Sequence, residues 1–366
     1  MRVLFLGAYD KAEIVLAPIK VGRELFKQIS AKGVNSVFLC YFDDGSKYTR
    51  IQKLLGFEKI SDRVYRCGIL PLILFTIKFK PDIVQIVTPD AFYLPLFFLK
   101  AIQKFRIVYL SHSIISYYLK NFLKLSCYHK LRFKIIEKIV LKYSDMLEIL
   151  SKVEARFLIR FLKVQYDKIR IVDNGIYPYG IIKKYGDNTD IINIIFVGSI
   201  ARKEKSFDFL LQALSKINNQ IILSVYSYDQ QEKGNLEIPK NVKLILGASL
   251  TEIELRNKFC KNDLFIIPSK RDTFPLSLLE AMDTGMLFIS TDRVGLTERF
   301  PEPFKRFVVP CGDTEKLTDK ILELRQLDYV EKNQLADEIR KFTVDYTWDK
   351  ISGQYIELYY EILDRN

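Results

Sequence analysis

The strongest constraint on the fold is the alternation of short, wholly apolar runs with longer amphipathic stretches. In the first half of the chain the apolar runs occupy residues 3–7, 36–42, 82–87, 106–110, 145–150 and 168–172. Strands that are apolar along their whole length are typical of a parallel sheet covered on both faces. Between the first two runs, Val21, Leu25 and Ile29 recur at four-residue spacing, and Gly33 follows as a helix stop. The pattern predicts βα units that build a parallel sheet.

The same pattern restarts after a break at residues 173–190, which contain three glycines and one proline and are predicted to be a linker. Further strands are expected at 191–198, 221–226, 242–246, 264–268 and 286–290, with a helix near 206–217 and a last helix at about 348–363. A chain of 366 residues exceeds the size at which one hydrophobic core keeps growing. We therefore predict an α/β protein with two Rossmann-like, doubly wound domains that face each other across a cleft.

The first domain is expected at residues 1–180 and the second at residues 181–347. The terminal helix, about 348–366, is expected to pack back on the first domain. In doubly wound sheets ligands bind beyond the carboxyl ends of the strands, so the functional residues are sought there.

Positive charge is concentrated in the first half of the chain. Residues 1–180 hold 30 Lys and Arg against 15 Asp and Glu, whereas residues 181–366 hold 26 against 29. This balance favours an anionic partner, such as anionic lipid, a phosphorylated substrate or nucleic acid. A biased surface that only keeps the protein soluble explains it equally well. No helix-turn-helix, RNP or zinc pattern supports nucleic acid, and none is expected as a partner.

The five cysteines are scattered and form no Cys-x-x-Cys pair. This favours reduced thiols and a cytoplasmic location over a zinc site or a disulfide framework. The longest apolar runs, 69–77 and 91–99, reach about half the length of a bilayer-spanning helix, so no transmembrane segment is expected.

Residues 268–286 place two acids around the start of a predicted helix. Pro275 suits the first helical turn, Thr273 is expected to cap it and Gly285 to end it. Asp272 then lies at a helix N-terminus, where free N–H groups suit a phosphate. Glu280 lies among apolar residues, and its side chain leans back toward the same end. Either a ligand satisfies these acids, or Asp272 stabilises the helix dipole and Glu280 pairs with a local Arg or Lys.

A second strand, loop and helix occupy residues 196–214. The loop carries Arg202, Lys203 and Lys205 directly before the helix. A helix N-terminus prefers negative charge, so basic side chains beside it indicate an anion site. Two such loops in one domain could hold both phosphates of a diphosphate, whereas solvated loop charges are the alternative for any single residue.

These segments resemble the retaining, nucleotide-sugar-dependent glycosyltransferases of family 4, which have the two-domain B-type fold. The family's Pro-Ser strand end, Glu-x7-Glu motif, Gly-Leu-x-Glu motif and Val-Gly-Arg phosphate loop correspond here to Pro268-Ser269, Asp272-x7-Glu280, Gly295-Leu296-Thr297-Glu298 and Val197-Gly198-Ser199 with Lys205. The sequence departs from the family where Asp272 replaces Glu, Thr273 replaces Gly, and Ser199 replaces Arg. Arg202 would then supply the second positive charge.

The resemblance implies a donor site made of Gly198, Ser199, Arg202, Lys205, Asp272, Thr273, Phe274, Pro275, Leu276, Glu280, Gly295 and Glu298. It implies that Glu280 holds the ribose of the nucleotide and that Asp272 faces the hydroxyls of the donor sugar. Lys205 would neutralise the diphosphate leaving group, and His112 would reach the reacting centre from the first domain. These roles make His112, Asp272 and Lys205 the candidate catalytic residues.

The implied reaction is transfer of a hexosyl unit from a nucleotide-diphosphate sugar to a hydroxyl of a glycan or lipid-linked acceptor, with retained anomeric configuration. The sequence contains no Asp-x-Asp motif, so neither a catalytic metal nor another cofactor is expected. Alternatives are a nucleotide-sugar epimerase or hydrolase on the same fold, and a non-catalytic relative that only binds nucleotide.

Residues 117–142 are rich in lysine, with aromatic and aliphatic residues between the charges. This composition is typical of an amphipathic helix on an anionic leaflet, although a solvated helix face is equally compatible with it. We hypothesise a peripheral enzyme at the cytoplasmic face of the membrane. Its membrane or acceptor side would include Lys120, Lys124, Lys130, Arg132, Lys134 and Lys138.

Overall fold

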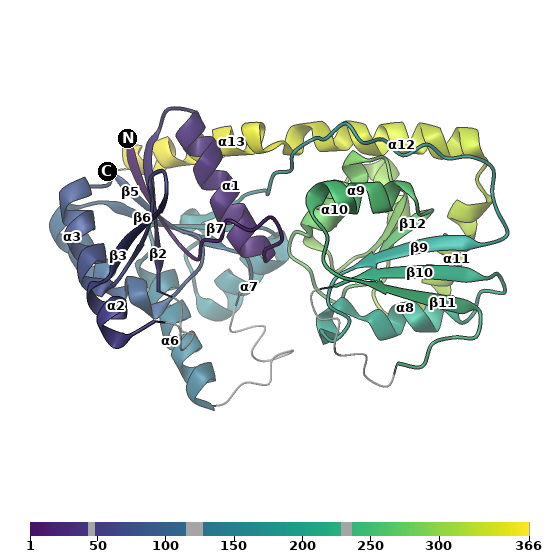
Figure 1. Cartoon of the computed structure of the whole chain (residues 1–366), viewed down its shortest axis with the longest axis horizontal. Coiled ribbons are helices and arrows are strands. Elements are labelled where there is room, and N and C mark those ends of the chain that lie inside the picture. The colour runs from purple at the N-terminus through teal and green to yellow at the C-terminus, as the bar shows by residue number, and fades with distance from the viewer. Residues whose placement is uncertain (43–47, 115–126, 228–235, 366) are drawn as a thin grey trace. The chain divides into compact units, whose positions relative to one another are not determined.

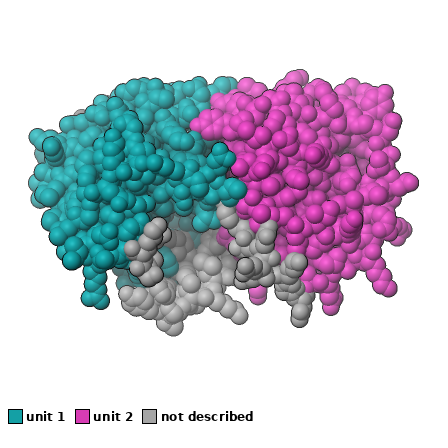
Figure 2. Space-filling view, in the orientation of Figure 1, with its two compact units in different colours: residues 1–175, 348–366 teal, residues 176–347 magenta. Residues whose placement is uncertain are grey.

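The computed structural model describes residues 1–42, 48–114, 127–227 and 236–365, and the side chains of residues 127–130 are not part of this description. The chain divides into two compact units (Figures 1 and 2). Unit 1 comprises Met1–Gly175 and Trp348–Asn366, and unit 2 comprises Ile176–Thr347. The linker predicted at residues 173–190 contains the first of these boundaries and is largely irregular.

Unit 1 is built on an eight-stranded sheet with the order β3-β4-β2-β1-β5-β6-β7-β8 among the described residues. All neighbouring strands are parallel except the pair β3 and β4. The strands are β1 Arg2–Leu6, β2 Asn35–Tyr41, β3 Phe57–Ser61, β4 Val64–Cys67, β5 Ile83–Ile86, β6 Arg106–Ser111, β7 Met146–Ile149 and β8 Ile169–Ile171.

The helices of unit 1 follow these strands. They are α1 Ala17–Ala31, α2 Arg50–Leu55, α3 Ile69–Phe79, α4 Leu94–Gln103, α6 Cys127–Tyr143, α7 Lys152–Leu162 and α13 Trp348–Asp364, with short 3-10 turns at Ala91–Tyr93 and Tyr166–Lys168. The helix predicted from the spacing of Val21, Leu25 and Ile29 is α1. It begins before Val21, because Pro18 supplies the first turn, and it ends before Gly33, whose φ of +83° suits glycine. No helix in the described part of the chain combines the length and the apolarity that crossing a bilayer requires.

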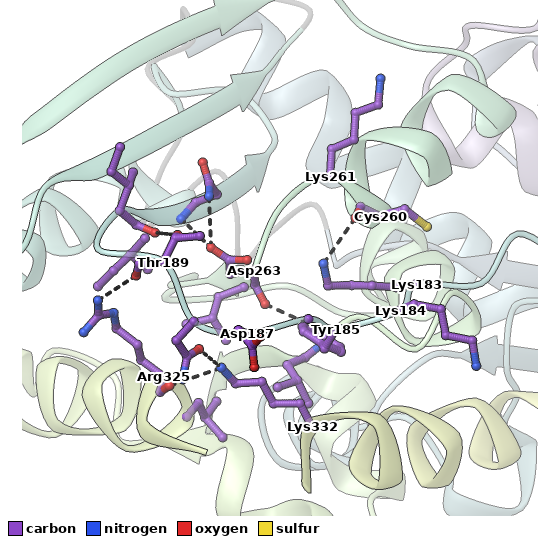
Figure 3. Close-up of a pocket in the computed structure, with 18 residues that line it drawn as sticks. Lys183, Lys184, Tyr185, Asp187, Thr189, Cys260, Lys261, Asp263, Arg325 and Lys332 are labelled. Carbon is purple, nitrogen blue, oxygen red and sulfur yellow. Dashed lines mark hydrogen bonds between the residues drawn. The ribbon is translucent and has the colours of Figure 1, made fainter. Parts of the chain in front are cut away.

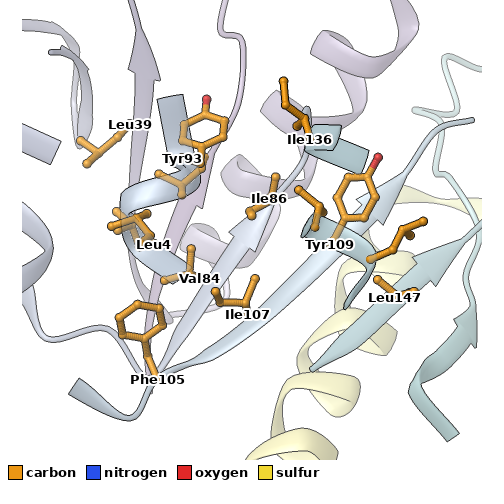
Figure 4. Packing of buried hydrophobic residues seen from close by; sticks show 14 of the residues in the cluster. Leu4, Leu39, Val84, Ile86, Tyr93, Phe105, Ile107, Tyr109, Ile136 and Leu147 are labelled. Carbon is orange, nitrogen blue, oxygen red and sulfur yellow. The ribbon is translucent and has the colours of Figure 1, made fainter. Parts of the chain in front are cut away.

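The core of unit 1 lies on its central strands, where aliphatic side chains from neighbouring strands pack together (Figure 4). Leu4 on β1, Leu39 on β2, Val84 on β5 and Leu147 on β7 have no solvent exposure. Complete burial of such a side chain contributes about 1.5–3 kcal/mol. The apolar runs that form the central strands are therefore buried on both faces of the sheet.

Helix α13 attaches to this unit through α1 and through the sheet (Figure 1). The hydroxyl of Tyr359 donates to Oε1 of Gln85 at 2.8 Å, and Nε2 of Gln85 donates to Oε2 of Glu148 at 2.8 Å. Glu148 lies on β7 without solvent exposure, and burial raises the pKa of its carboxyl to about 8. A protonated Glu148 avoids the cost of a buried negative charge.

Unit 2 contains a six-stranded, wholly parallel sheet with the order β11-β10-β9-β12-β13-β14 in the described residues. Its strands are β9 Ile192–Val197, β10 Ile221–Tyr226, β11 Val242–Gly247, β12 Leu264–Ile267, β13 Phe288–Thr291 and β14 Val308–Val309. Its helices are α8 Phe207–Leu214, α9 Glu252–Cys260, α10 Leu276–Asp283, α11 Thr314–Gln326 and α12 Tyr329–Thr343, with 3-10 helices η3 Lys203–Lys205, η4 Gly295–Arg299, η5 Glu302–Phe307 and η6 Val344–Tyr346. The prediction of two Rossmann-like α/β units is confirmed.

We predict that Glu148 makes the stability of unit 1 depend on pH. The folded protein keeps this proton up to about pH 8, whereas the unfolded chain loses it near the ordinary pKa of about 4.3. Between these values the folded state binds more protons, so the free energy of unfolding falls as pH rises, by at most about 1.4 kcal/mol per pH unit.

Urea unfolding measures this slope, because the fluorescence of Trp348, the only tryptophan of the chain, reports on unit 1. The stability of Glu148→Gln relative to the unaltered protein should increase from about pH 5 to about pH 8. A difference that stays constant over this range would contradict the raised pKa of Glu148.

Candidate functional site

Three loops of unit 2 meet at the carboxyl edge of its sheet. They follow β9, β12 and β13, which are adjacent parallel strands and therefore end at the same edge. Backbone hydrogen bonds connect the loops: the N–H of Lys270 donates to the carbonyl of Glu204 at 2.8 Å, and the N–H of Gly295 donates to the carbonyl of Asp272 at 2.7 Å. The three loops form one connected surface.

An ion pair joins the first two loops. Nζ of Lys205, at the end of η3, lies 2.6 Å from Oδ2 of Asp272, which follows β12. Their side chains are 21% and 15% exposed, so the pair lies at the surface but is partly shielded from water. The structure thus brings together two residues that are 67 positions apart in the sequence.

The loop after β9 allows close approach to its backbone. Gly198 has a φ of +149°, a conformation that L side chains rarely adopt. Within the described residues, the hydroxyls of Ser199 and Ser269 are buried and have no hydrogen-bond partner in the protein. These two hydroxyls, at the ends of β9 and β12, are available to an oxygen-rich ligand. Ser269 had been identified only as part of the Pro-Ser motif.

Helix α10 differs from its prediction at the N-terminus. Pro275, with a φ of −71°, is the N-cap, and no side chain caps the helix, so the prediction that Thr273 caps it is wrong. The reason is a tertiary contact: Asp272 pairs with Val294 as an isolated parallel bridge, which keeps the preceding backbone extended. The helix includes Glu280, whose residue is 4% exposed, between side chains with no exposure.

The third loop positions an arginine that the sequence motifs did not identify. A guanidinium nitrogen of Arg299 donates to the carbonyl of Gly295 at 3.2 Å and lies 3.4 Å from a carboxylate oxygen of Glu298. The guanidinium also lies 5.6 Å from the centre of the Phe274 ring, within the range of a cation–π contact. Arg299 therefore contacts three of the predicted donor-site residues. In the sequence, only its position next to Glu298 could have indicated that it belongs to the site.

Two family models match this sequence. Residues 192–326 match the model described as Glycosyl transferases group 1, and residues 21–178 match the model described as Glycosyltransferase Family 4. Together the two matches span most of the chain. The chain belongs to glycosyltransferase family 4.

Similar proteins agree with this family. N-acetyl-alpha-D-glucosaminyl L-malate synthase of Bacillus anthracis is 28% identical over 195 residues, which are 50% of this chain and 50% of that enzyme. The matched part thus spans about half the length of that relative. Two solved structures share the B-type fold. Sucrose-phosphate synthase from Thermosynechococcus elongatus has a TM-score of 0.74 at 15% identity and 100% coverage of both chains. Anabaena HepE in complex with UDP-glucose has a TM-score of 0.70 at 14% identity, covering 99% of this chain and 100% of that one.

Two cationic residues of the loop that follows β9 are paired within the protein. Arg202 lies 2.6 Å from a carboxylate oxygen of Glu204, whose side chain is only 5% exposed. Lys205 pairs with Asp272, as described above. An anionic ligand that bound at this edge would therefore compete with these carboxylates for the two cations, or would share the cations with them.

His112 belongs to unit 1, whereas Lys205 and Asp272 belong to unit 2. It follows β6 directly, at the carboxyl end of that strand. Burial lowers the pKa of its imidazole to about 4, and the ring hydrogen-bonds to the backbone of Val87. The imidazole is therefore neutral at pH 7, so it can donate or accept a hydrogen bond but carries no charge.

The basic segment lies only partly in the described structure. Lys120 and Lys124 lie outside the described residues, and the side chain of Lys130 is not described, although its backbone is in α6. Further along α6, Arg132 is partly exposed and Lys134 and Lys138 are exposed. The other predicted donor-site residues, Thr273, Pro275 and Leu276, lie between Asp272 and the first turn of α10.

Proposed function

We propose that this chain transfers a hexosyl unit from a nucleotide-diphosphate sugar to a hydroxyl of a glycan or lipid-linked acceptor, with retained anomeric configuration. The observation that carries the proposal is the pair of Lys205 and Asp272, held where β9 and β12 end and beside the N-terminus of α10. Cations and free N–H groups at one edge are suited to the two phosphates of a diphosphate.

Leaving-group stabilisation is the main task of such a site. As the bond between the sugar and the diphosphate breaks, negative charge grows on the phosphate oxygen, and Lys205 is positioned to stabilise it. The acceptor hydroxyl would attack from the face on which the diphosphate leaves, and the departing phosphate would take the hydroxyl proton. Asp272 would accept hydrogen bonds from hydroxyls of the donor sugar. The proposal includes no catalytic metal, because Lys205 and the helix N-terminus provide the positive charge.

Glu280 would bind the ribose of the nucleotide. Glu280 is buried, with 4% of the residue exposed, and two vicinal hydroxyls can each donate a hydrogen bond to a carboxylate. Glu280 lies one turn into α10, and helical side chains lean toward the N-terminus, which is where the phosphates would lie. Its role would therefore be in binding the nucleotide.

The test is a panel of nucleotide sugars, each given to the protein with a range of hydroxyl acceptors and with EDTA present. We expect one donor to be consumed only with acceptor, to yield a nucleoside diphosphate and a product with the anomeric configuration of the donor by proton NMR. Epimerised or hydrolysed donor without acceptor would favour the alternative enzymes, and nucleotide binding without turnover would favour a non-catalytic relative.

In the same assay, Glu280→Ala should lower kcat/KM about a hundredfold, equal to roughly 3 kcal/mol for charge-assisted hydrogen bonds. Glu338→Ala is a matched control, because it removes an exposed carboxylate from α12. An unchanged rate in Glu280→Ala would contradict the ribose assignment.

We also propose that unit 1 contacts an anionic membrane at the cytoplasmic face through α6. Leu131 and Ile135 are 60% and 49% exposed, and Lys138 and Lys142 continue the same helix face at offsets of seven and eleven residues from Leu131. The opposite face of α6 is buried and includes Ile136 and Val140 at 4% and 1% exposure. Exposed aliphatic residues between lysines fit an interface that has both acyl chains and anionic headgroups.

We predict that the protein sediments with liposomes that contain anionic phospholipid at low salt and not with zwitterionic liposomes. The variant Lys134→Glu/Lys138→Glu should lose most of this binding, since each basic residue near the surface contributes about 1 kcal/mol. Lys240→Glu changes an exposed lysine of unit 2 and should bind as the unaltered protein does. Equal sedimentation of all three proteins would contradict the assignment to α6.

A further inference from the structure

A polar cavity of about 240 Å³ opens at the amino edge of the sheet of unit 2 (Figure 3). Its wall includes Ile192 and Leu264, the first residues of β9 and β12, and Leu287, which directly precedes β13. Lys205 and Asp272 lie at the other ends of these strands. The six residues of β9 separate the two edges by roughly 17 Å. The cavity is therefore distinct from the site at the carboxyl edge.

Two buried lysines reach this cavity from different segments, Lys183 from the linker and Lys332 from α12. They are 5% and 7% exposed. Nζ of Lys183 donates to the carbonyl of Cys260 at 3.2 Å and lies 4.3 Å from the centre of the Tyr185 ring. Nζ of Lys332 donates to the carbonyl of Arg325 at 3.1 Å and to the side-chain oxygen of Asn188 (Figure 3).

Neither ammonium group forms a hydrogen bond or a close ion pair with a carboxylate in the described part of the chain. Asp263 is the acid that acts on both through space, but its Oδ2 accepts from the backbone N–H of Asn193 at 2.8 Å and from the side-chain amide of Asn193 at 3.1 Å. Burial lowers the pKa of Lys183 and of Lys332. Buried ammonium groups are costly unless an opposite charge compensates them.

The residues that line the cavity carry a net positive charge. Besides two acids, Asp187 and Asp263, the cavity is lined by five basic residues, which are Lys183, Lys184, Lys261, Arg325 and Lys332. Besides burial, the charge of Lys332 lowers the pKa of Lys183, and the charge of Arg325 lowers the pKa of Lys332. An anion between them would remove this repulsion and supply acceptors to both.

We propose that this cavity binds a small phosphorylated anion, held between Lys183 and Lys332. Its volume lies below the range of about 300–1,000 Å³ that is usual for larger organic ligands, which favours an anion of the size of phosphate or pyrophosphate over an intact nucleotide sugar. Lys183 belongs to the linker and Lys332 to α12, so the bound anion connects these two segments of unit 2.

The experiment uses pyrophosphate as the probe and the full-length variant Lys205→Met, which lacks the cation that pairs with Asp272 at the carboxyl edge. We expect Lys205→Met still to bind pyrophosphate saturably in isothermal titration calorimetry and to melt at a higher temperature when it is bound. Adding Lys183→Met and Lys332→Met should weaken this binding at least about tenfold, as expected for the loss of charge-assisted hydrogen bonds. The outcome does not depend on whether the protein transfers sugar.

Two controls keep the result interpretable. Lys240→Met in the Lys205→Met background removes an exposed charge from unit 2 outside the cavity and should leave pyrophosphate binding unchanged. Lys332→Gln alone retains a donor for Asn188 while it removes the charge, and it should weaken binding without loss of fold. No saturable binding in Lys205→Met, or binding that Lys183→Met, Lys332→Met and Lys332→Gln leave unaltered, would overturn the proposal.

Discussion

The ion pair between Lys205 and Asp272 is the contact on which the site of unit 2 depends. It connects the ends of two adjacent strands, and the backbone bonds from Lys270 to Glu204 and from Gly295 to Asp272 fix the same loops to one another. An ion pair at the protein surface contributes about 1 kcal/mol or less to stability, so the main effect of this pair is to fix the position of Lys205. It holds a cation at the sheet edge with its countercharge alongside, and an anionic ligand can share that cation without the full cost of desolvating it.

The cations at the two edges of this sheet have different kinds of partner. At the carboxyl edge, Arg202 pairs with Glu204 and Lys205 pairs with Asp272, so both of these cations have a carboxylate partner. At the amino edge, Lys183 and Lys332 bond to carbonyl and amide oxygens. In unit 1, burial instead lowers the pKa of His112 and raises that of Glu148, so these two side chains are neutral at pH 7.

The features that the sequence predicted are those that depend on a local pattern of residues. The apolar runs mark β1, β2, β5 to β8 and β9 to β13 to within two residues at each end, because all of these strands except β8 and β11 are buried along most of their length. The sequence analysis did not predict β3 and β4, because neither contains a continuous apolar run, or β14, because it has only two residues. The contacts of the site depend on tertiary structure. The bridge between Asp272 and Val294 keeps the backbone before α10 extended, so the helix begins after Pro275 and Thr273 is not its cap. Nothing in the local sequence of the polar linker indicates that Lys183 is buried.

The most direct test of this account is calorimetric titration of a nucleoside diphosphate into the unaltered protein, Asp272→Asn and Lys205→Met. Removing the carboxylate releases Lys205, so Asp272→Asn should bind the diphosphate more tightly, by up to about fivefold or roughly 1 kcal/mol. Lys205→Met should bind it at least about tenfold more weakly, as a lost charge-assisted hydrogen bond implies. If Asp272→Asn binds no more tightly and Lys205→Met binds as the unaltered protein does, the ion pair does not mark the diphosphate site.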